Sequence, residues 1–344
     1  MREIQLSKIV DVYDNMRRPL STMVRSTMPG KYPYYSANGI IDSINRFIFS
    51  GEYILVAEDG SVRSSDGKPI IKLTKADERF WVSNHAHVLK AKGGILNKYL
   101  YYNLSQVNVD QIITGAVQLK VSQENLLKLK VKLHSFDEQQ HIVDTIGTVD
   151  SLIEFNQEKI SKIKSLATQK YEFLYKAYPK SAIGKRLKFI KGKQPKFVSK
   201  EDGLPYLVID DLASNIYTQF SSEGLACDEN DVLMVMDGAS SGKVFTGNKG
   251  YVGSTLAKLS SSQIKSSILY FGLSKFEEEI MKNTTGSAIP HTDKSFVSEL
   301  QIIDDLDGKT TDFFDFCLNQ ICNLRTQNFL LNIQKEILLQ KFFH

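Results

Sequence analysis

The chain has 344 residues, of which 42% are hydrophobic and 24% charged, and a formal net charge of +4. This length accommodates two ordinary domains, and no run approaches the roughly 18 apolar residues of a membrane-spanning helix. The first ten residues are mixed and polar, unlike a secretory signal. The cysteines Cys227, Cys317 and Cys322 are odd in number and lack metal-ligand spacing. We therefore expect buried thiols in a reducing cytoplasm.

Charge is distributed unevenly along the chain. Residues 1–135 carry 19 Lys and Arg against 12 Asp and Glu, a net charge of +7. Residues 180–309 are nearly balanced, with 16 basic and 17 acidic residues, but they open with a basic run from Lys180 to Lys200 that contains no acid. Each segment can therefore form a positive patch, which is typical of nucleic-acid-binding proteins and also of ordinary solvated surface.

Residues 1–135 read as a first domain of short strands and one or two helices. Strands are predicted around Gly51 (residues 47–58) and from Trp81 to Lys90, with turns of Gly, Asp and Asn between them. Residues 99–105 read as an amphipathic helix, and residues 61–68 form a long polar loop. This pattern predicts an α+β domain with a curved antiparallel or mixed sheet.

Residues 136–179 read as one long helix that separates two domains. Its apolar residues recur three and four positions apart: Ile142, Ile146, Val149, Ile153, Ile160, Ile163, Ala167 and Leu174. Only Asn156 and Lys170 interrupt this stripe, which has the heptad spacing of a helix that packs on another helix. About 40 helical residues would extend roughly 60 Å, so the helix also serves as a spacer.

Residues 180–309 repeat the first domain. The segment LVAEDG at 55–60 matches LMVMDG at 233–238, and VSNHAHVL at 82–89 matches VGSTLAKL at 252–259. The helix at 99–105 matches residues 268–274, and Thr114-Gly115 matches Thr285-Gly286. Four blocks in one order indicate a tandem duplication.

Residues 310–344 read as a second long helix. Its stripe consists of Phe314, Cys317, Ile321, Leu324, Asn328, Leu331, Lys335, Leu338 and Phe342. An antiparallel pairing that sets Asn156 opposite Asn328 also matches Ile153 with Leu331, Ile160 with Leu324, Ile163 with Ile321 and Ile146 with Leu338. A buried Asn fixes the register of such a pair. The alternative is that each stripe packs separately on its own domain.

No segment predicts a catalytic or metal site. Residues 238–244 resemble a phosphate-binding loop but are one residue short and lack the Ser or Thr after Lys243. A Rossmann Gly-x-Gly-x-x-Gly and an Asn-Pro-Pro-aromatic string are both absent. Asp59 with Asp66-Gly67-Lys68 loosely matches a nuclease set, although polar turns explain these residues more simply. His85 and His87 alternate along a strand, so they cannot bind one metal, and we expect one in the core and the other at the surface.

Several strings together resemble one known family. These are residues 34–40 (YYSANGI), 51–60 (GEYILVAEDG), 84–89 (NHAHVL), 285–291 (TGSAIPH) and 136–140 (FDEQQ). With the order domain, helix, domain, helix, they are similar to the specificity subunit of type I restriction–modification systems. Two strings depart from it: Val117-Gln118-Leu119 stands where the family often has Pro, and residues 309–312 replace the usual acidic-glutamine helix start.

The resemblance implies a fold and a function. It implies an α+β chain with two tandem target-recognition domains (1–135 and 180–309), separated by an antiparallel coiled-coil pair of spacer helices (136–179 and 310–344). Such a subunit reads an asymmetric bipartite DNA target and has no catalytic site or cofactor of its own. Its partners would be two modification (methyltransferase) subunits that bring S-adenosylmethionine, and a motor-nuclease subunit. Two other classes stay open: an unusual nuclease or methyltransferase, and a scaffold in another phage-defence or fused restriction system.

DNA readers need basic, amide and hydroxyl side chains on loops that fit a groove. In the first domain the candidates are Arg17, Arg18, Ser36, Asn38, Ser61, Arg63, Ser64, Lys68, His85, Gln118 and Lys120. In the second they are Lys191, Lys193, Ser240, Ser241, Lys243 and His291. Each could instead be a solvated loop residue, and Asn38 and Asp59 could equally shape turns.

Overall fold

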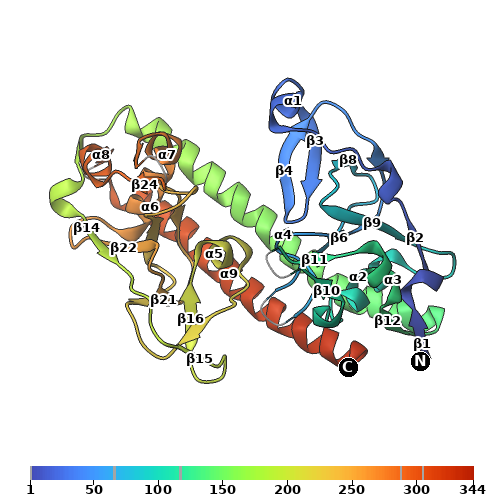
Figure 1. Cartoon of the computed structure of the whole chain (residues 1–344). Coiled ribbons are helices and arrows are strands. Elements are labelled where there is room, and N and C mark those ends of the chain that lie inside the picture. The colour runs from blue at the N-terminus through green and yellow to red at the C-terminus, as the bar shows by residue number, and fades with distance from the viewer. Residues whose placement is uncertain (1, 65–66, 116–117, 287–288, 304–305) are drawn as a thin grey trace. The chain divides into compact units, whose positions relative to one another are not determined.

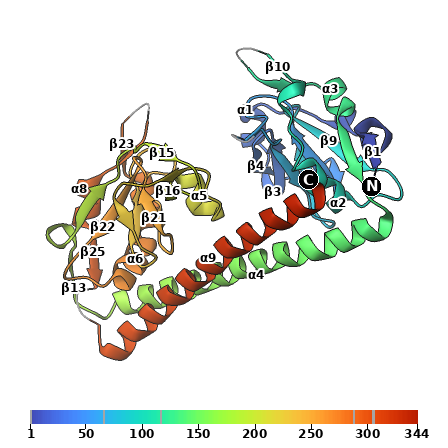
Figure 2. The same ribbon diagram turned by 90° about the horizontal axis from the view of Figure 1, so that it is seen from below.

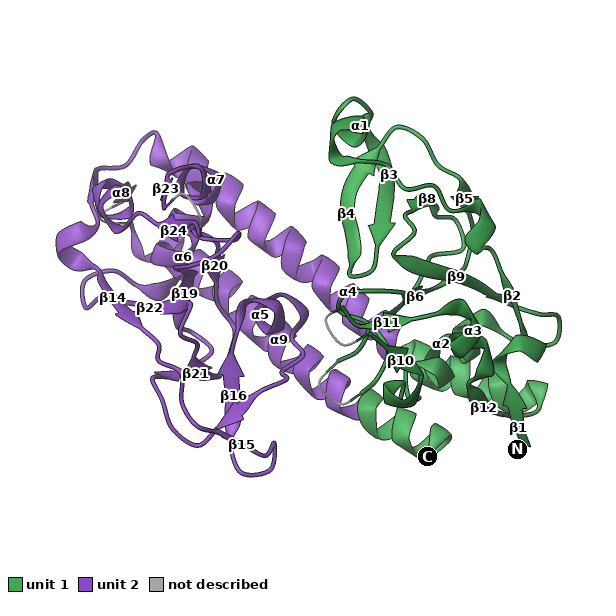
Figure 3. Cartoon of the chain, in the orientation of Figure 1, with its two compact units in different colours: residues 1–148, 335–344 green, residues 149–334 purple. Residues whose placement is uncertain are grey.

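The computed structural model describes all residues except 1, 65–66, 116–117, 287–288 and 304–305 (Figure 1). Asp66, in the loose nuclease match, and residues 287–288 of the Thr-Gly loop lie outside the described residues. The chain forms two compact units, residues 1–148 with 335–344 and residues 149–334 (Figure 3). Each unit therefore combines one globular lobe with a section of both long helices.

Within its described residues, unit 1 contains two four-stranded sheets, the two-stranded sheets β1-β12 and β10-β11, and three short helices. The sheet orders are β2-β9-β6-β7 and β4-β3-β8-β5, the second being mixed because β3 and β8 run parallel. The strands are β1 (Arg2–Gln5), β2 (Val10–Val12), β3 (Pro29–Ser36), β4 (Gly39–Ile44), β5 (Phe49–Ser50), β6 (Ile54–Ala57), β7 (Ile71–Leu73), β8 (Arg79–Val82), β9 (Ala86–Ala91), β10 (Ile113–Thr114), β11 (Lys120–Val121) and β12 (Lys130–Leu133). The helices are α1 (Thr22–Ser26), α2 (Asn97–Leu104) and α3 (Gln123–Lys128), with 3-10 turns at Leu6–Lys8, Asp14–Met16 and Asp110–Ile112.

The described part of unit 2 forms a four-stranded and a five-stranded sheet, ordered β14-β22-β19-β20 and β15-β17-β16-β21-β18, and the two-stranded sheets β13-β25 and β23-β24. Its strands are β13 (Lys180–Ala182), β14 (Lys188–Lys191), β15 (Phe197–Val198), β16 (Leu204–Leu207), β17 (Phe220–Ser221), β18 (Ala226–Cys227), β19 (Val232–Val235), β20 (Val244–Phe245), β21 (Gly250–Val252), β22 (Leu256–Ser260), β23 (Thr284–Thr285), β24 (His291–Thr292) and β25 (Gln301–Ile303). Its helices are α5 (Ile209–Ser214), α6 (Ser266–Lys275), α7 (Glu277–Lys282) and α8 (Lys294–Glu299), with a 3-10 turn at Gly184–Arg186.

The duplication is visible in individual backbone hydrogen bonds. Glu58 N donates to His85 O, and Met236 N makes the same bond to Thr255 O. Gly60 N donates to Leu119 O, and Gly238 N donates to Pro290 O. A further match, absent from the four sequence blocks, is the parallel strand pair β3–β8 in unit 1 and β16–β21 in unit 2. The two lobes are therefore copies of one fold.

The two long helices are α4 (Phe136–Tyr175) and α9 (Gly308–Phe343), and Figure 2 shows them side by side. Helix α4 begins with a capping box, because the Ser135 hydroxyl accepts from Glu138 N and the Glu138 carboxylate accepts from Ser135 N at 2.9 Å. Helix α9 begins after Asp307, whose carboxylate accepts from Thr310 N at 2.9 Å.

The predicted antiparallel register is confirmed within unit 2. Asn156 Nδ2 donates to Asn328 Oδ1 at 2.9 Å, and both side chains are buried. Ile160 and Ile163 pack on the same core cluster as Ile321. In unit 1, Ile146 joins a cluster that includes the α9 residues Leu338, Leu339, Phe342 and Phe343. The alternative, in which each stripe packs separately, does not hold.

Two further expectations concern strand continuity and the membrane. The predicted single strand from Trp81 to Lys90 is wrong, because the Ser83 hydroxyl accepts from His85 N at 3.2 Å and turns the chain between β8 and β9. Among the described residues, every helix is too short or too polar to cross a bilayer.

Candidate nucleic-acid interface

Each unit contains a turn–hairpin site, which we define as the Asp-Gly turn that follows a central strand together with the hairpin bonded to it. In unit 1 the site is residues 58–61 with the β10–β11 hairpin; in unit 2 it is residues 236–241 with the β23–β24 hairpin. Isolated bridges join Asp59 to Lys120 and Asp237 to His291. Gly60 and Gly238 adopt φ of +74° and +106°, a region that glycine enters without strain. Residues 58–61 and 236–239 are therefore matched positions.

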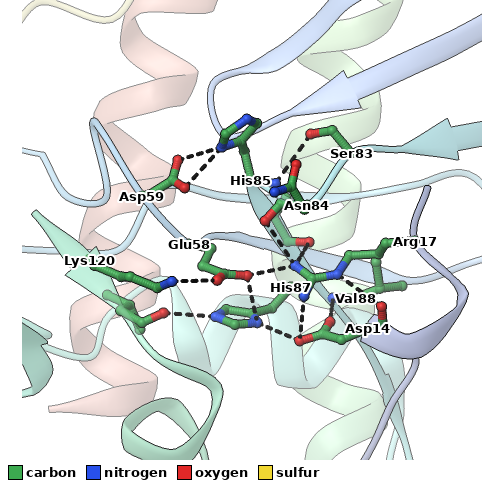
Figure 4. A network of polar contacts seen from close by, with 12 residues as sticks. Asp14, Arg17, Glu58, Asp59, Ser83, Asn84, His85, His87, Val88 and Lys120 are labelled. Carbon is green, nitrogen blue, oxygen red and sulfur yellow. Dashed lines mark hydrogen bonds and ion pairs between the residues drawn. The ribbon is translucent and has the colours of Figure 1, made fainter. Parts of the chain in front are cut away.

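A buried histidine holds the site of unit 1 together (Figure 4). The His87 side chain is 1% exposed; its Nδ1 lies 2.6 Å from Asp14 Oδ2 and its Nε2 lies 2.8 Å from Val121 O. Both ring nitrogens thus face acceptors. The ring joins the 3-10 turn at Asp14, the strand β9 and the hairpin strand β11. His87 is the core imidazole that the sequence predicted for one of the two histidines.

Glu58 lies beside this ring and collects three basic partners. Its carboxylate lies 2.7 Å from Arg17, 3.1 Å from Lys120 and 3.6 Å from His87. Burial alone would raise the pKa of Glu58, but hydrogen bonds and charge interactions with these bases outweigh it and hold the pKa below its ordinary value. The cluster is therefore a charged network that fixes the loops around it.

Asp14, Glu58 and His87 also bring three ligand-type atoms within 4.8 Å of one another. The surroundings do not suit a cation, because the Arg17 guanidinium and the Lys120 ammonium already occupy the Glu58 carboxylate. His87 further has Nε2 committed to a backbone carbonyl. We interpret the group as an ion-pair network and assign it no metal.

Unit 2 builds its site from different side chains. Lys191 Nζ lies 2.6 Å from Asp237 Oδ2, and His291 Nδ1 lies 2.7 Å from Asp237 Oδ1. Burial would raise the pKa of Asp237, but its hydrogen bonds to Lys191 and His291 lower it below the ordinary value. The position of Glu58 is taken by Met236, which is buried. The two copies therefore share a backbone frame and differ in chemistry.

The predicted DNA-binding residues differ in accessibility. The exposed ones are Arg18, Asn38, Ser61, Arg63, His85, Gln118, Lys120, Lys191, Lys193 and His291. The half-buried ones are Arg17, Ser36, Ser64, Lys68, Ser240 and Lys243. Ser241 is buried, and its hydroxyl donates to the carbonyls of Gly238 and Pro290 at 2.7 and 2.9 Å. It ties the turn to the hairpin, and we do not carry its predicted DNA contact forward.

Other candidates are engaged inside the protein. Besides Glu58, the Arg17 guanidinium donates to the carbonyl of Ala86 at 2.9 Å, so it supports the site and does not extend toward solvent. Arg63 pairs with Asp110 at 2.9 Å. Lys120 pairs with Glu58 and Lys191 pairs with Asp237, but both side chains stay about half exposed, at 51% and 48%, and can still reach DNA.

Sequence reasoning did not include the acids Asp14, Glu58, Asp59 and Asp237 among the functional residues. Asp59 was considered only in the loose nuclease match and as a turn residue. The signal that was available is the Asp-Gly dipeptide at the same place in both copies.

Several known proteins resemble this chain in sequence and in fold. Residues 1–165 match the family model described as type I restriction modification DNA specificity domain. A putative type I restriction enzyme specificity subunit of Haemophilus influenzae is 28% identical over 147 residues, which is 43% of this chain and 37% of that protein. The MjaVIII specificity subunit of Methanocaldococcus jannaschii is 31% identical over 175 residues, 47% of this chain and 40% of that protein.

The matched segments thus span less than half the length of these relatives. Among solved structures, the S subunit of a type I restriction–modification system from M. genitalium superimposes with a TM-score of 0.53 at 18% identity, over 100% of this chain and 96% of that one. This likeness confirms the expected α+β fold with its pair of long helices. Residues 1–165, just under half of the chain, therefore match the type I restriction–modification DNA specificity domain, and along its whole length the chain shares the fold of a solved type I S subunit.

Proposed function

We propose that this chain is the DNA sequence-specificity subunit of a type I restriction–modification complex and catalyses nothing itself. The observation that carries the proposal is the turn–hairpin site, which occurs once in each unit on the same backbone frame but with different side chains. A repeated frame suits two similar contacts with a duplex, and unlike side chains suit two different half-sites. The target is then asymmetric and bipartite.

We further propose that the helix pair sets the unread gap between the half-sites, as fixed spacing does in dimeric DNA-binding proteins. Helix α4 supports this role because it is one uninterrupted helix of 40 residues that contributes to both units. The buried Asn156–Asn328 pair fixes the register of α4 against α9. A slip of either helix would separate these amides.

An exposed apolar stripe on α4 supports the docking of a partner. Leu152, Phe155, Leu166 and Phe173 are 46%, 53%, 59% and 75% exposed. Their separations of 3, 11 and 7 residues place them on one helical face, outside the seam that contacts α9. We propose that a modification subunit, which brings S-adenosylmethionine and performs the methylation, covers this face. A motor-nuclease subunit joins for cleavage.

The stripe can be tested with the modification subunit expressed together with this chain. Replacing Phe155 and Phe173 by Ser should abolish co-purification while leaving the helical circular dichroism unchanged. The matched control is Glu158→Ser, an exposed α4 residue outside the stripe. Full retention of the partner by the double variant would refute this docking face.

The function itself is tested by DNA binding of the same complex. Sequence-specific enrichment from a randomised duplex library supports the proposal. Equal affinity for scrambled DNA would favour a scaffold. Methylation or cleavage of DNA by the purified chain alone, with S-adenosylmethionine or a metal ion, would instead show an enzyme.

The three buried cysteines are free thiols, and burial raises the pKa of each. They fit the cytoplasmic location that we propose for the complex.

A further inference from the structure

An aspartate–histidine pair stands at the turn–hairpin site of both units. In unit 1, His85 Nδ1 lies 2.8 and 2.9 Å from the two oxygens of Asp59 (Figure 4). In unit 2, His291 Nδ1 lies 2.7 Å from Asp237 Oδ1. The histidine side chains are 46% and 49% exposed, whereas the aspartates are only 20% and 22% exposed. Each pair thus presents its ring to solvent and keeps its acid behind it.

The two pairs do not use matched histidines. His85 occupies the position of Thr255, because the carbonyls of these two residues accept the equivalent backbone bonds. His291 occupies the position of Lys120, since each follows the residue whose carbonyl accepts from the glycine of the turn. Only the aspartate is common to both copies. The same pairing is therefore reached from two different segments, which points to a shared requirement for the pair.

The negative charge of Asp59 and Asp237 also needs a reason. Both aspartates lie on a surface proposed to face phosphates, where a carboxylate repels DNA. A carboxylate that accepts from Nδ1–H offsets this cost by fixing the ring orientation and leaving Nε2 for another partner. A neutral ring can accept there from the amino group of adenine or cytosine, and a charged ring can donate to guanine.

We propose that Asp59 and Asp237 are positioning residues that hold His85 and His291 against base edges of duplex DNA, one pair in each half-site. The inference rests on the proposed function and deepens it, because it names one base-reading group in each unit. It also assigns the acids a role that their charge alone does not suggest.

The test uses the full-length chain in complex with its modification subunit and a duplex library randomised over both half-sites. Asp59→Ala should reduce the preference for one base in one half-site by about fivefold, the effect of a single hydrogen bond. Binding to scrambled duplex should stay equal or rise, because a negative charge is lost. Asp59→Asn, which keeps an acceptor for Nδ1–H, should retain most of the preference.

A double-variant cycle separates positioning from a general structural role. His85→Ala should relax the same base position as Asp59→Ala, and the combined variant should lose no more than His85→Ala alone. Asp237→Ala and His291→Ala should act in the same way on the other half-site. The half-site read by the unaltered unit serves as the internal control for folding.

Three results would overturn the inference. The first is that Asp59→Ala binds DNA more tightly and keeps its base preference. The second is that the losses of base preference in Asp59→Ala and His85→Ala add up in the double variant. The third is that Asp59→Ala loses affinity equally for target and scrambled DNA. A wild-type complex that enriches no sequence would instead refute the proposed function, and this inference with it.

Discussion

The Asn156–Asn328 pair offers a quantitative test of the helix register. The side chains are 7% and 2% exposed, and the Asn328 amide also donates to Ile153 O at 3.4 Å. Replacing one Asn by Leu leaves the other amide buried without its partner, which costs about 1–3 kcal/mol. Replacing both removes the two polar groups together and continues the apolar seam. The double variant should therefore exceed each single variant in stability by about 1–3 kcal/mol.

The assay is urea denaturation followed by the helical circular dichroism signal, with stability compared through the midpoint at unchanged slope. The single tryptophan, Trp81, lies in unit 1, so its fluorescence would not report on this pair. Asn323→Leu, at an exposed α9 position, is the matched control and should shift stability by no more than about 0.5 kcal/mol. Stability that rises in equal, additive steps through the two single variants would refute the pairing.

Three further predictions concern the loop of Lys243, the ion-pair network of Glu58 and the two long helices. Lys243→Ala should relax base preference or weaken binding in one half-site only, as measured by library enrichment; equal losses in both would show that the loop assignment is wrong. The pKa of Glu58 is lower in the folded chain than its ordinary value near 4.5, so the ionised side chain stabilises the folded state at pH values above 4.5. This contribution disappears as the pH falls through the pKa of the folded state. Acid titration of stability should therefore be shallower in Glu58→Gln than in wild type, and identical curves would exclude a role for this group. Insertion of one heptad into each long helix, which preserves the register, should lengthen the unread gap by about three base pairs, since seven residues add about 10 Å; an unchanged gap in the methylated motif would contradict the spacer role.

The long helices were predictable because their stability depends on regular periodicity. Heptad spacing and one Asn in each stripe were enough to specify both partners and the register. The predicted ends were off by a few residues: α4 ends at Tyr175, short of 179, and α9 begins at Gly308, before residue 310. Helix ends depend on caps such as Asp307, which the stripe does not encode.

The candidate sites were only partly predictable. Loop positions followed from the repeated Asp-Gly and Thr-Gly strings, but contacts within the loops depend on which side chains tertiary structure brings together. Arg17 illustrates this, because its partners Glu58 and Ala86 lie 41 and 69 residues away. The sequence places Ser241 in a polar loop, but in the structure the side chain is buried and its hydroxyl donates to carbonyls of its own turn and of the hairpin. The expected split of His85 and His87 into surface and core is confirmed, but its stated reason was wrong, because His85 lies in the turn before β9 and only His87 lies on the strand.

The central claim is that two unlike copies of one fold each read half of a DNA target. It is tested most directly by sequencing the methylated bases in the genome of a host that expresses this chain with its modification subunit. We expect a single asymmetric motif of two different short half-sites, separated by a gap of fixed length and methylated in both. One contiguous motif, two identical half-sites, or methylation without sequence preference would contradict it.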